Sequence, residues 1–340
     1  MKLGLRIALV VVIVLIVVIG VGGVKVLGPR AFLGPRSRPL TARTFDVTPA
    51  RLQRGEYLAS SIGCLYCHSP HDWSKRDDPI LPGMTGAGQQ LPYTDLPGKV
   101  LAPNLTPDKE SGAGNWTDDM LARAIREGIG YDGRALFGIM PFAHYRNMPD
   151  EDLASIIVYL RSLPAVRNTL PETEIIFPVK YIMRNDPQPL TTMVPSPDVS
   201  DPVKRGRFLV NLIGCADCHT PVDAHHIPIS GMEFSGGQVF QTAWGTVASA
   251  NLTPDPSGIP YYDEAAFIKA MRTGRVEARE LNKTMPWSAL RNLTDQDLAG
   301  IFAYLRTLKP VTHRVDNKEP PTLCPLDGAT HGAGSQNRKE

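Results

Sequence analysis

The sequence is poor in aromatic residues, which make up 7% of its 340 residues, and it has little excess charge, with a formal net value of +2. The balanced charge gives no indication of a nucleic-acid or strongly acidic partner. Cysteine is scarce at 5 residues, whereas glycine and proline supply 30 and 31. This composition favours short helices joined by long irregular loops over a large sheet. The length suits two domains, each needing another apolar object at its centre to complete a core.

Long apolar runs are absent except at the N-terminus, where uncharged residues extend from Ile7 to Val24. A run of this length predicts a transmembrane anchor over residues 1–27, with a linker over 28–50. The stretch from Gly20 to Gly23 resembles a cleavage zone, so a cleaved signal peptide is the competing interpretation. Basic residues are more frequent after the run than before it, and charge counting alone would place the rest of the chain in the cytoplasm.

An internal repeat follows the anchor. Its landmarks return in the same order with slightly drifting offsets, as loop trimming in a duplicated domain would produce. The recurring segments are residues 54–58 and 205–209, 62–70 and 213–221, 104–108 and 251–255, 140–142 and 285–287, and 158–163 and 303–308. We therefore predict one domain over 51–166, a second over 204–312, a proline-rich linker over 167–203 and a tail over 313–340.

Each copy of the repeat contains the pattern Cys-x-x-Cys-His, a pattern that is rare by chance. Two thiols one helical turn apart can each add to a vinyl group of haem, and the next residue then offers an imidazole to the iron. This predicts two covalently bound haem c groups. Structural zinc sites or redox dithiols are the alternatives. Because thioether attachment occurs outside the cytoplasm, the motifs place the domains in the periplasm, against the charge count. The predicted haem-binding residues are Cys64, Cys67 and His68 in the first copy, and Cys215, Cys218 and His219 in the second.

The sixth iron ligand has to come from elsewhere in each copy. Met140 and Met285 recur at matched places, and each precedes a proline in a loop just ahead of a predicted amphipathic helix. A thioether is a soft, uncharged ligand that suits the iron of an electron carrier. We predict His68 with Met140 and His219 with Met285 as the axial pairs. The alternative is that these methionines only fill the core. The remaining candidates do not keep aligned places, and they are Met84, Met148, Met232, Met271, His71, His144, His225 and His226.

Apolar residues at helical spacing predict a helix near the end of each copy, with stripes through Leu153 and Leu160 and through Leu298 and Leu305. Thr294 followed by Asp297 resembles a capping box. Middle helices are predicted from about Thr117 to Glu127 and from Asp263 to Arg272, each followed by a glycine.

The repeated residues resemble class I cytochrome c domains, in tandem, like those in the cytochrome subunits of bacterial membrane-bound dehydrogenases for alcohols, aldehydes and sugar acids. The resemblance implies an all-α fold in which Gly55 packs near Tyr159 and Gly206 near Tyr304. The chain departs from the alcohol dehydrogenase subunits, which carry three haem motifs, in having two. The residues that carry the resemblance are Gly55, Cys64, Cys67, His68, 104–108, Met140, Tyr159, Gly206, Cys215, Cys218, His219, 251–255, Met285 and Tyr304.

The predicted function is electron relay from a dehydrogenase or quinol-linked complex to a terminal oxidase or soluble carrier, without catalysis by the chain itself. A di-haem enzyme, of the peroxidase or thiosulfate dehydrogenase type, would need an open site at one iron, whereas both copies offer a methionine. A cytochrome subunit of a terminal oxidase is the third interpretation. The predicted location is the inner membrane, with lipid and redox proteins as partners and no nucleic acid. Cys324, in the tail, is interpreted as an incidental thiol.

Overall fold

The computed structural model describes residues 3–276, 279–315, 317, 322–326, 328, 330 and 331. This part of the chain is rich in helices, and its strands are only two to four residues long. The structure therefore confirms that the fold is rich in helices, although the described residues also include short strands. Much of the predicted tail, 313–340, lies outside the described residues.

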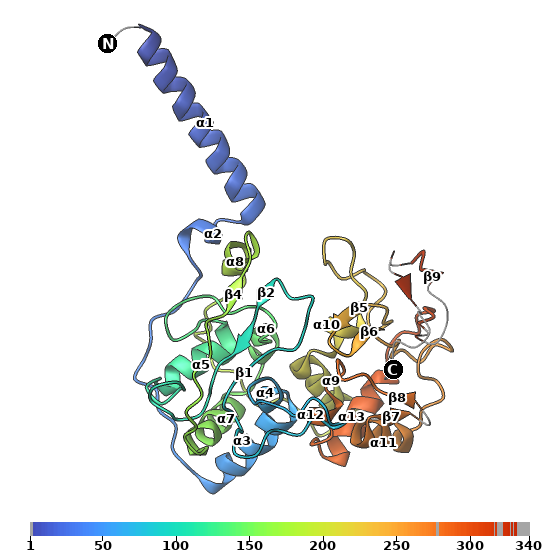
Figure 1. Ribbon diagram of the computed structural model, residues 1–340. Helices are drawn as coiled ribbons and strands as arrows, with labels where there is room; N and C mark the ends of the chain where they lie inside the picture. Colours follow the sequence, from blue (N-terminus) through green and yellow to red (C-terminus); the bar gives the residue numbers. More distant parts are fainter. Residues whose placement is uncertain are drawn as a thin grey trace. The chain divides into compact units, whose positions relative to one another are not determined.

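The chain divides into two compact units, and Figure 1 labels their helices and strands. The first contains the described parts of residues 1–44, 116–146 and 174–192, and the second contains those of 45–115, 147–173 and 193–340. These units differ from the domains that the repeat predicts. The boundaries at 51–166 and 204–312 therefore stay a prediction drawn from the sequence.

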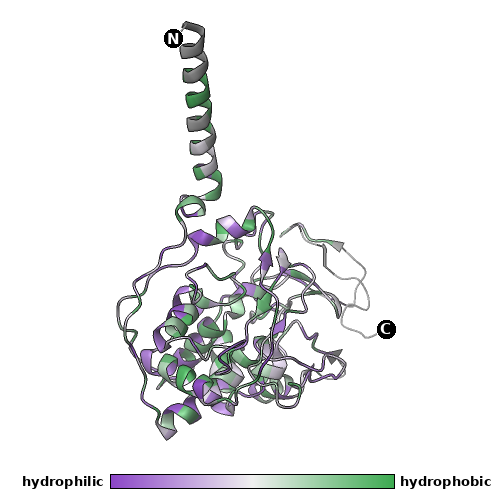
Figure 2. Cartoon of the chain, turned by 60° about the vertical axis from the view of Figure 1, so that its left-hand side comes forward, coloured by the Kyte–Doolittle hydropathy of each residue, from purple (hydrophilic) through white to green (hydrophobic). Residues whose placement is uncertain are grey.

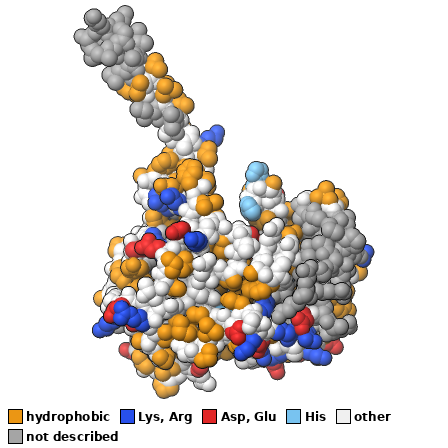
Figure 3. All heavy atoms as spheres, in the orientation of Figure 1, with side chains coloured by type: hydrophobic (Ala, Val, Ile, Leu, Met, Phe, Trp, Pro, Cys, Tyr) orange, Lys and Arg blue, Asp and Glu red, His pale blue; other side chains and the backbone are white. Residues whose placement is uncertain are grey.

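The first unit begins with α1 (Leu3–Leu27), a helix of 25 residues and hence about 37 Å long. Its segment Val10–Leu27 is long and apolar enough to cross a membrane, a test that a signal sequence would also pass. Figures 2 and 3 show hydrophobic residues along the described part of this segment. The other elements of the unit are α2 (Arg30–Leu33), α5 (Asp118–Glu127), α6 (Phe142–Tyr145), β4 (Glu174–Ile175), α8 (Val179–Ile182) and the 3-10 turn η1 (Met183–Asn185).

Helix α5 begins and ends where the sequence predicts. The Thr117 hydroxyl oxygen accepts a hydrogen bond from the Met120 amide at 3.1 Å, and the helix ends at Gly128 with φ of 72°. A side chain at Gly128 would collide with the ring of Phe142, so this glycine also permits close approach of α6.

The second unit contains eight of the described helices, in the order α3, α4, α7, α9, α10, α11, α12 and α13. Their bounds are α3 (Pro49–Ser61), α4 (Cys64–Cys67), α7 (Asp150–Ser162), α9 (Pro202–Ile213), α10 (Cys215–His219), α11 (Glu264–Thr273), α12 (Trp287–Leu290) and α13 (Asp295–Leu305). Helix α11 ends at Gly274 with φ of 60°, and α13 begins at Thr294, whose side chain accepts a hydrogen bond from the Asp297 amide at 3.1 Å. Both observations confirm the predicted helix signals.

The strands of this unit form short antiparallel pairs. In the longest, Val239 lies opposite Ala248 and Thr242 opposite Gly245. The paired strands are β1 (Gln89–Gln90) with β3 (Leu101–Ala102), β5 (Val239–Thr242) with β6 (Gly245–Ala248), β7 (Arg275–Val276) with β8 (Arg279–Glu280), and β9 (Thr322–Leu323) with β10 (Thr330–His331). A further strand, β2, covers Gly98–Lys99.

Two helix crossings form the centre of the second unit, α3 against α7 and α9 against α13. At Gly55 an added Cβ would lie 2.0 Å from the Ser155 carbonyl oxygen and 2.6 Å from the Tyr159 Cβ. At Gly206 it would lie 1.8 Å from the Gly300 carbonyl oxygen and 2.8 Å from the Tyr304 Cβ. Only glycine allows backbones this close. The expectation that each glycine meets the matched tyrosine is confirmed.

Candidate functional site

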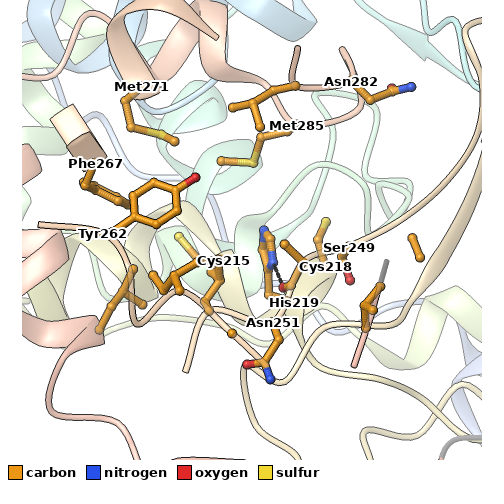
Figure 4. Close-up of a pocket in the computed structure, with 18 of the residues that line it drawn as sticks. Cys215, Cys218, His219, Ser249, Asn251, Tyr262, Phe267, Met271, Asn282 and Met285 are labelled. Atoms are coloured by element: carbon orange, nitrogen blue, oxygen red, sulfur yellow. Dashed lines mark hydrogen bonds between the residues drawn. The ribbon is translucent and has the colours of Figure 1, made fainter. Parts of the chain in front are cut away.

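A cavity of about 890 Å³ lies in the second unit, next to α10. Cys215, Cys218 and His219 line it from one side, and Met285 lines it from the loop before α12. Figure 4 shows the His219 ring and the Met285 side chain on opposite sides of the same cavity. The structure therefore brings together all four residues predicted for the second copy.

The position of His219 is fixed by the turn before α10 and by a contact with a backbone carbonyl. Gly214 ends α9 with φ of 77°, which turns the chain directly into α10. The Nδ1 atom of His219 lies 2.7 Å from the Ala250 carbonyl oxygen. Because a carbonyl can only accept, this contact assigns the proton to Nδ1 and leaves the Nε2 lone pair free to bind a metal.

The loop that carries Met285 is ordered by a side-chain turn. The Asn282 side-chain oxygen accepts hydrogen bonds from the Thr284 amide at 2.9 Å and from the Thr284 hydroxyl at 2.8 Å. The Met285 amide then donates to the Asn282 carbonyl at 3.0 Å. A loop fixed in this way can present a ligand without help from a regular helix or strand.

The first copy repeats the local geometry of the histidine. Gly63 precedes α4 with φ of 103°, and the Nδ1 atom of His68 lies 2.8 Å from the Pro103 carbonyl oxygen. The His68 carbonyl accepts from the Gly88 amide at 2.7 Å, as the His219 carbonyl accepts from the Gly236 amide at the same distance. Met140 belongs to the first compact unit, in the loop before α6. Its predicted role as sixth ligand to the iron at His68 stays a prediction.

Burial favours the neutral form of both motif histidines and the un-ionised form of the motif thiols. It lowers the pKa of His68 and of His219, which keeps both rings neutral, as metal ligation requires. It raises the pKa of Cys67 to about 11 and that of Cys215 to about 12. A reactive redox dithiol needs the opposite shift. Among the described residues, no group of three or more His, Cys, Asp and Glu side chains is placed to hold a metal such as zinc.

Comparison with known proteins shows what the chain is similar to. No family model matches the chain. It is 28% identical over 287 residues to the fructose dehydrogenase cytochrome subunit of Gluconobacter japonicus, covering 78% of this chain and 55% of that protein. It is 29% identical over 280 residues to the gluconate 2-dehydrogenase cytochrome c subunit of Pantoea cypripedii, covering 76% and 60%. This chain is related to the cytochrome c subunits of dehydrogenases.

A shorter relative matches over more of its length. The diheme cytochrome c-type protein of Cereibacter sphaeroides is 26% identical over 263 residues, which cover 76% of this chain and 86% of that protein. The chain spans only about half the length of the fructose dehydrogenase cytochrome subunit. Both kinds of relative are cytochrome c proteins, and the two Cys-x-x-Cys-His segments give this chain attachment points for two covalently bound haem c groups.

The residues that line this cavity fit haem c. Its volume is within the range of cofactor pockets, about 300–1,000 Å³, and two thiols and a neutral histidine line it together with apolar side chains. The apolar wall continues the hydrophobic core around Leu209, Phe234 and Phe302. Polar groups are present as well. They are Ser249, Asn251, Asp255, Ser257, Tyr261, Tyr262, Asn282, Thr284, Thr312, Arg314 and Asn317.

Some residues that line the cavity were not predicted from the sequence. Phe240 and Val247 come from the β5–β6 hairpin, and Thr312 and Arg314 come from the segment after α13. These segments carry no recurring motif, so only their position in space connects them with the site. Met271, which the sequence analysis set aside because it does not recur, also lines the cavity.

Proposed function

We propose that this chain is a membrane-anchored, periplasmic di-haem cytochrome c that relays electrons between a dehydrogenase or quinol-linked complex and a terminal oxidase or soluble carrier. The observation that carries the proposal is the arrangement of the cavity beside α10, where Cys215, Cys218 and His219 line one side and Met285 lies on the opposite side. Haem bound there supplies reversible one-electron exchange.

The chain's own residues favour transfer over catalysis. His219 is fixed by its hydrogen bond to Ala250, and Met285 is presented by an ordered loop. A matched pair of axial ligands leaves little room for a substrate at the iron, and Met/His ligation raises the reduction potential. By the same argument we propose Met140 as the partner of His68 in the first copy.

The dehydrogenase is proposed as the electron donor because the relatives are named as subunits of such enzymes. The membrane anchor is proposed because α1 has the length and composition of a spanning helix. The periplasmic side follows from where thioether attachment takes place. Membrane lipid and redox proteins are therefore the proposed partners, and the chain itself carries out no substrate chemistry.

An anaerobic redox titration of the full chain in detergent, followed by absorption, tests the proposal. We expect two low-spin haems that titrate at positive potentials and do not change on addition of imidazole, carbon monoxide or peroxide. A haem that binds these ligands readily or turns over peroxide would contradict it and favour a di-haem enzyme. Co-purification with an oxidase instead of a dehydrogenase would assign the chain to a terminal oxidase.

A further inference from the structure

The first compact unit carries an unusual cluster of exposed side chains at the C-terminal end of α1. Large apolar residues there are solvent-exposed, with Phe32 at 58%, Phe177 at 70% and Ile176 at 56%. A cluster of exposed aromatic and aliphatic side chains is typical of a surface that binds a membrane or another protein. We define the platform as residues 30–33 together with 176–185.

The two segments of the platform are held to the end of α1 by specific hydrogen bonds. The Asn185 side chain donates to the Leu27 carbonyl at 2.9 Å and accepts from the Arg30 amide at 3.2 Å. Arg184 donates to the Ala31 carbonyl at 2.9 Å. Gly28, with φ of 79°, lies so close to Asn185 that a side chain there would collide with it. Asn185 therefore pairs one of the carbonyl groups left open at the end of α1.

The platform also contacts α1 at a point before the C-terminal end of that helix. The Phe32 ring lies against Gly23, where an added Cβ would be 3.2 Å from the ring. Gly23 is four residues before the end of α1, which is about 6 Å along the helix axis. Gly23 is also within the segment Val10–Leu27 that is apolar enough to span a membrane. If that segment is in the bilayer, the Phe32 ring is at the depth of its interface.

The remaining side chains have the chemistry of a membrane–water interface. Tyr181 lies beneath two cations, with the Arg184 guanidinium 4.7 Å and the Lys180 ammonium 5.1 Å from its ring centroid, and the Phe177 ring is 6.1 Å away. Aromatic rings and basic groups together are typical of helix ends at lipid headgroups. Residues 24–36 contain three basic and no acidic residues, and residues 176–188 contain two basic and one acidic.

We propose that the platform is a docking surface for the headgroup region of an anionic lipid bilayer. The proposal rests on the proposed membrane anchoring by α1, and it adds that the segment between the two repeat copies is fixed at the membrane surface. The occupant is lipid because the surface is continuous with α1 and shares its apolar character. The segment is therefore a second membrane contact of the chain, distant in sequence from the first.

Spin labelling of the full chain in vesicles tests this. In a Cys324→Ser background, nitroxides are attached at Phe177→Cys, at Val18→Cys as the bilayer reference and at Lys109→Cys as an exposed reference. Both irons are kept reduced. We expect the label at 177 to be accessible to oxygen and shielded from a water-soluble nickel complex, with an accessibility ratio several-fold above that at 109.

The outcomes separate the platform from the anchor. A label at 18 in the bilayer with a label at 177 in water would overturn the platform and leave the anchor in place. Both labels in water would overturn the anchor itself, and the platform with it. Vesicles of phosphatidylcholine with and without phosphatidylglycerol test whether the platform prefers anionic lipid. If the label at 177 lies at the same depth in both kinds of vesicle at low salt, this preference is overturned.

A variant of the tether provides a second measurement. Asn185→Ala removes the hydrogen bonds to Leu27 and Arg30, so the label at 177 is expected to become more mobile and more accessible to the nickel complex. Asn115→Ala, which removes an exposed hydrogen bond to the Lys109 carbonyl, is the control and should leave the label at 177 unchanged. An unchanged label in Asn185→Ala would contradict the assigned tether.

Discussion

Two methionine side chains, Met285 and Met271, line the cavity beside α10, and only Met285 belongs to a recurring segment. Met285 is in an ordered loop on the side opposite His219, whereas Met271 projects from α11 beside Phe267 (Figure 4). If His219 held a haem here, the side chain opposite it would be placed to hold the haem as well, which favours Met285. Met271 is positioned as an apolar residue of the cavity wall.

Leucine substitutions distinguish these two roles. Met285→Leu is expected to open the sixth position, so that the reduced protein binds about one carbon monoxide per chain and the potential of one haem falls. Met271→Leu conserves volume and should leave both properties unchanged. Absorption spectra with carbon monoxide and a redox titration measure the two effects. Ligand binding by Met271→Leu instead would assign the axial role to Met271.

Gly206 is a second residue whose role can be tested alone. Gly206→Ala would place a methyl group 1.8 Å from the Gly300 carbonyl oxygen, so α9 and α13 would have to separate. We expect unfolding to become easier by about 3 kcal/mol or more, because backbone atoms cannot rotate away. Gly138→Ala is the matched control, since an added Cβ there meets nothing within 4 Å. Denaturant titration followed by circular dichroism measures both, and equal stability of the two variants would refute the tight crossing.

At the scale of the elements, α3 of the first copy meets α13 of the second through one tyrosine. The Tyr57 hydroxyl donates to Asp297 and accepts from the Thr294 amide at 3.2 Å. Burial, together with the hydrogen bond to Asp297, raises the pKa of Tyr57 from 10.0 to about 12. The protonated hydroxyl is thus favoured in the folded state, because its proton is needed for the bond to the carboxylate.

This shift predicts a loss of stability at alkaline pH. A group whose pKa is higher in the folded state stabilises the protein fully below its unfolded pKa, and the contribution disappears as pH rises through the folded value. The contribution of Tyr57 is therefore complete below about pH 10 and is lost towards pH 12. Tyr57→Phe should be less stable at pH 8 and show a flatter decline above pH 10. Equal slopes in the two proteins would contradict this role.

Much of the site could be predicted from local patterns. Cys215, Cys218 and His219 are adjacent in the sequence, and the repeat selects Met285, so both signals are visible without coordinates. Contacts between the copies could not be predicted, because they join single residues far apart in the chain. Trp73 and Trp244, whose ring centroids are 5.1 Å apart, are an example. The proline composition of segment 167–203 predicts a linker but not the short helix α8 or the turn η1 that this segment contains.

At the scale of the whole molecule, both haem motifs belong to the second compact unit, and polar contacts join their surroundings. The buried Lys283 ammonium donates to the Trp73 carbonyl at 2.7 Å and to the Lys75 carbonyl at 2.5 Å. Ser288 donates to Asp78 at 2.6 Å, and Tyr66 donates to the Lys283 carbonyl at 3.1 Å. Such contacts connect the surroundings of the two motifs, as the proposed relay between two haems would require.

Arg76 joins the two copies through both hydrogen bonds and an ion pair. Its guanidinium donates to the Thr273 and Gly274 carbonyls at 2.7 and 2.8 Å and pairs with Glu280 at 3.0 Å. A residue of the first copy thus caps the C-terminal end of α11 in the second, where a positive charge also suits the helix dipole. Losing it removes the cap and one link between the copies at the same time.

Arg76→Ala is therefore expected to cost about 2 kcal/mol, the usual size for hydrogen bonds to a charged group. It should also change the form of unfolding. The wild-type second unit should unfold in one calorimetric transition, because neither copy can open without breaking the contacts between them, whereas the variant should broaden or split it. Lys75→Ala is the control, since its side chain is exposed and only its carbonyl is used by Lys283. A single, unshifted transition in Arg76→Ala would mean that Arg76 does not couple the two copies and that other contacts set their relative position.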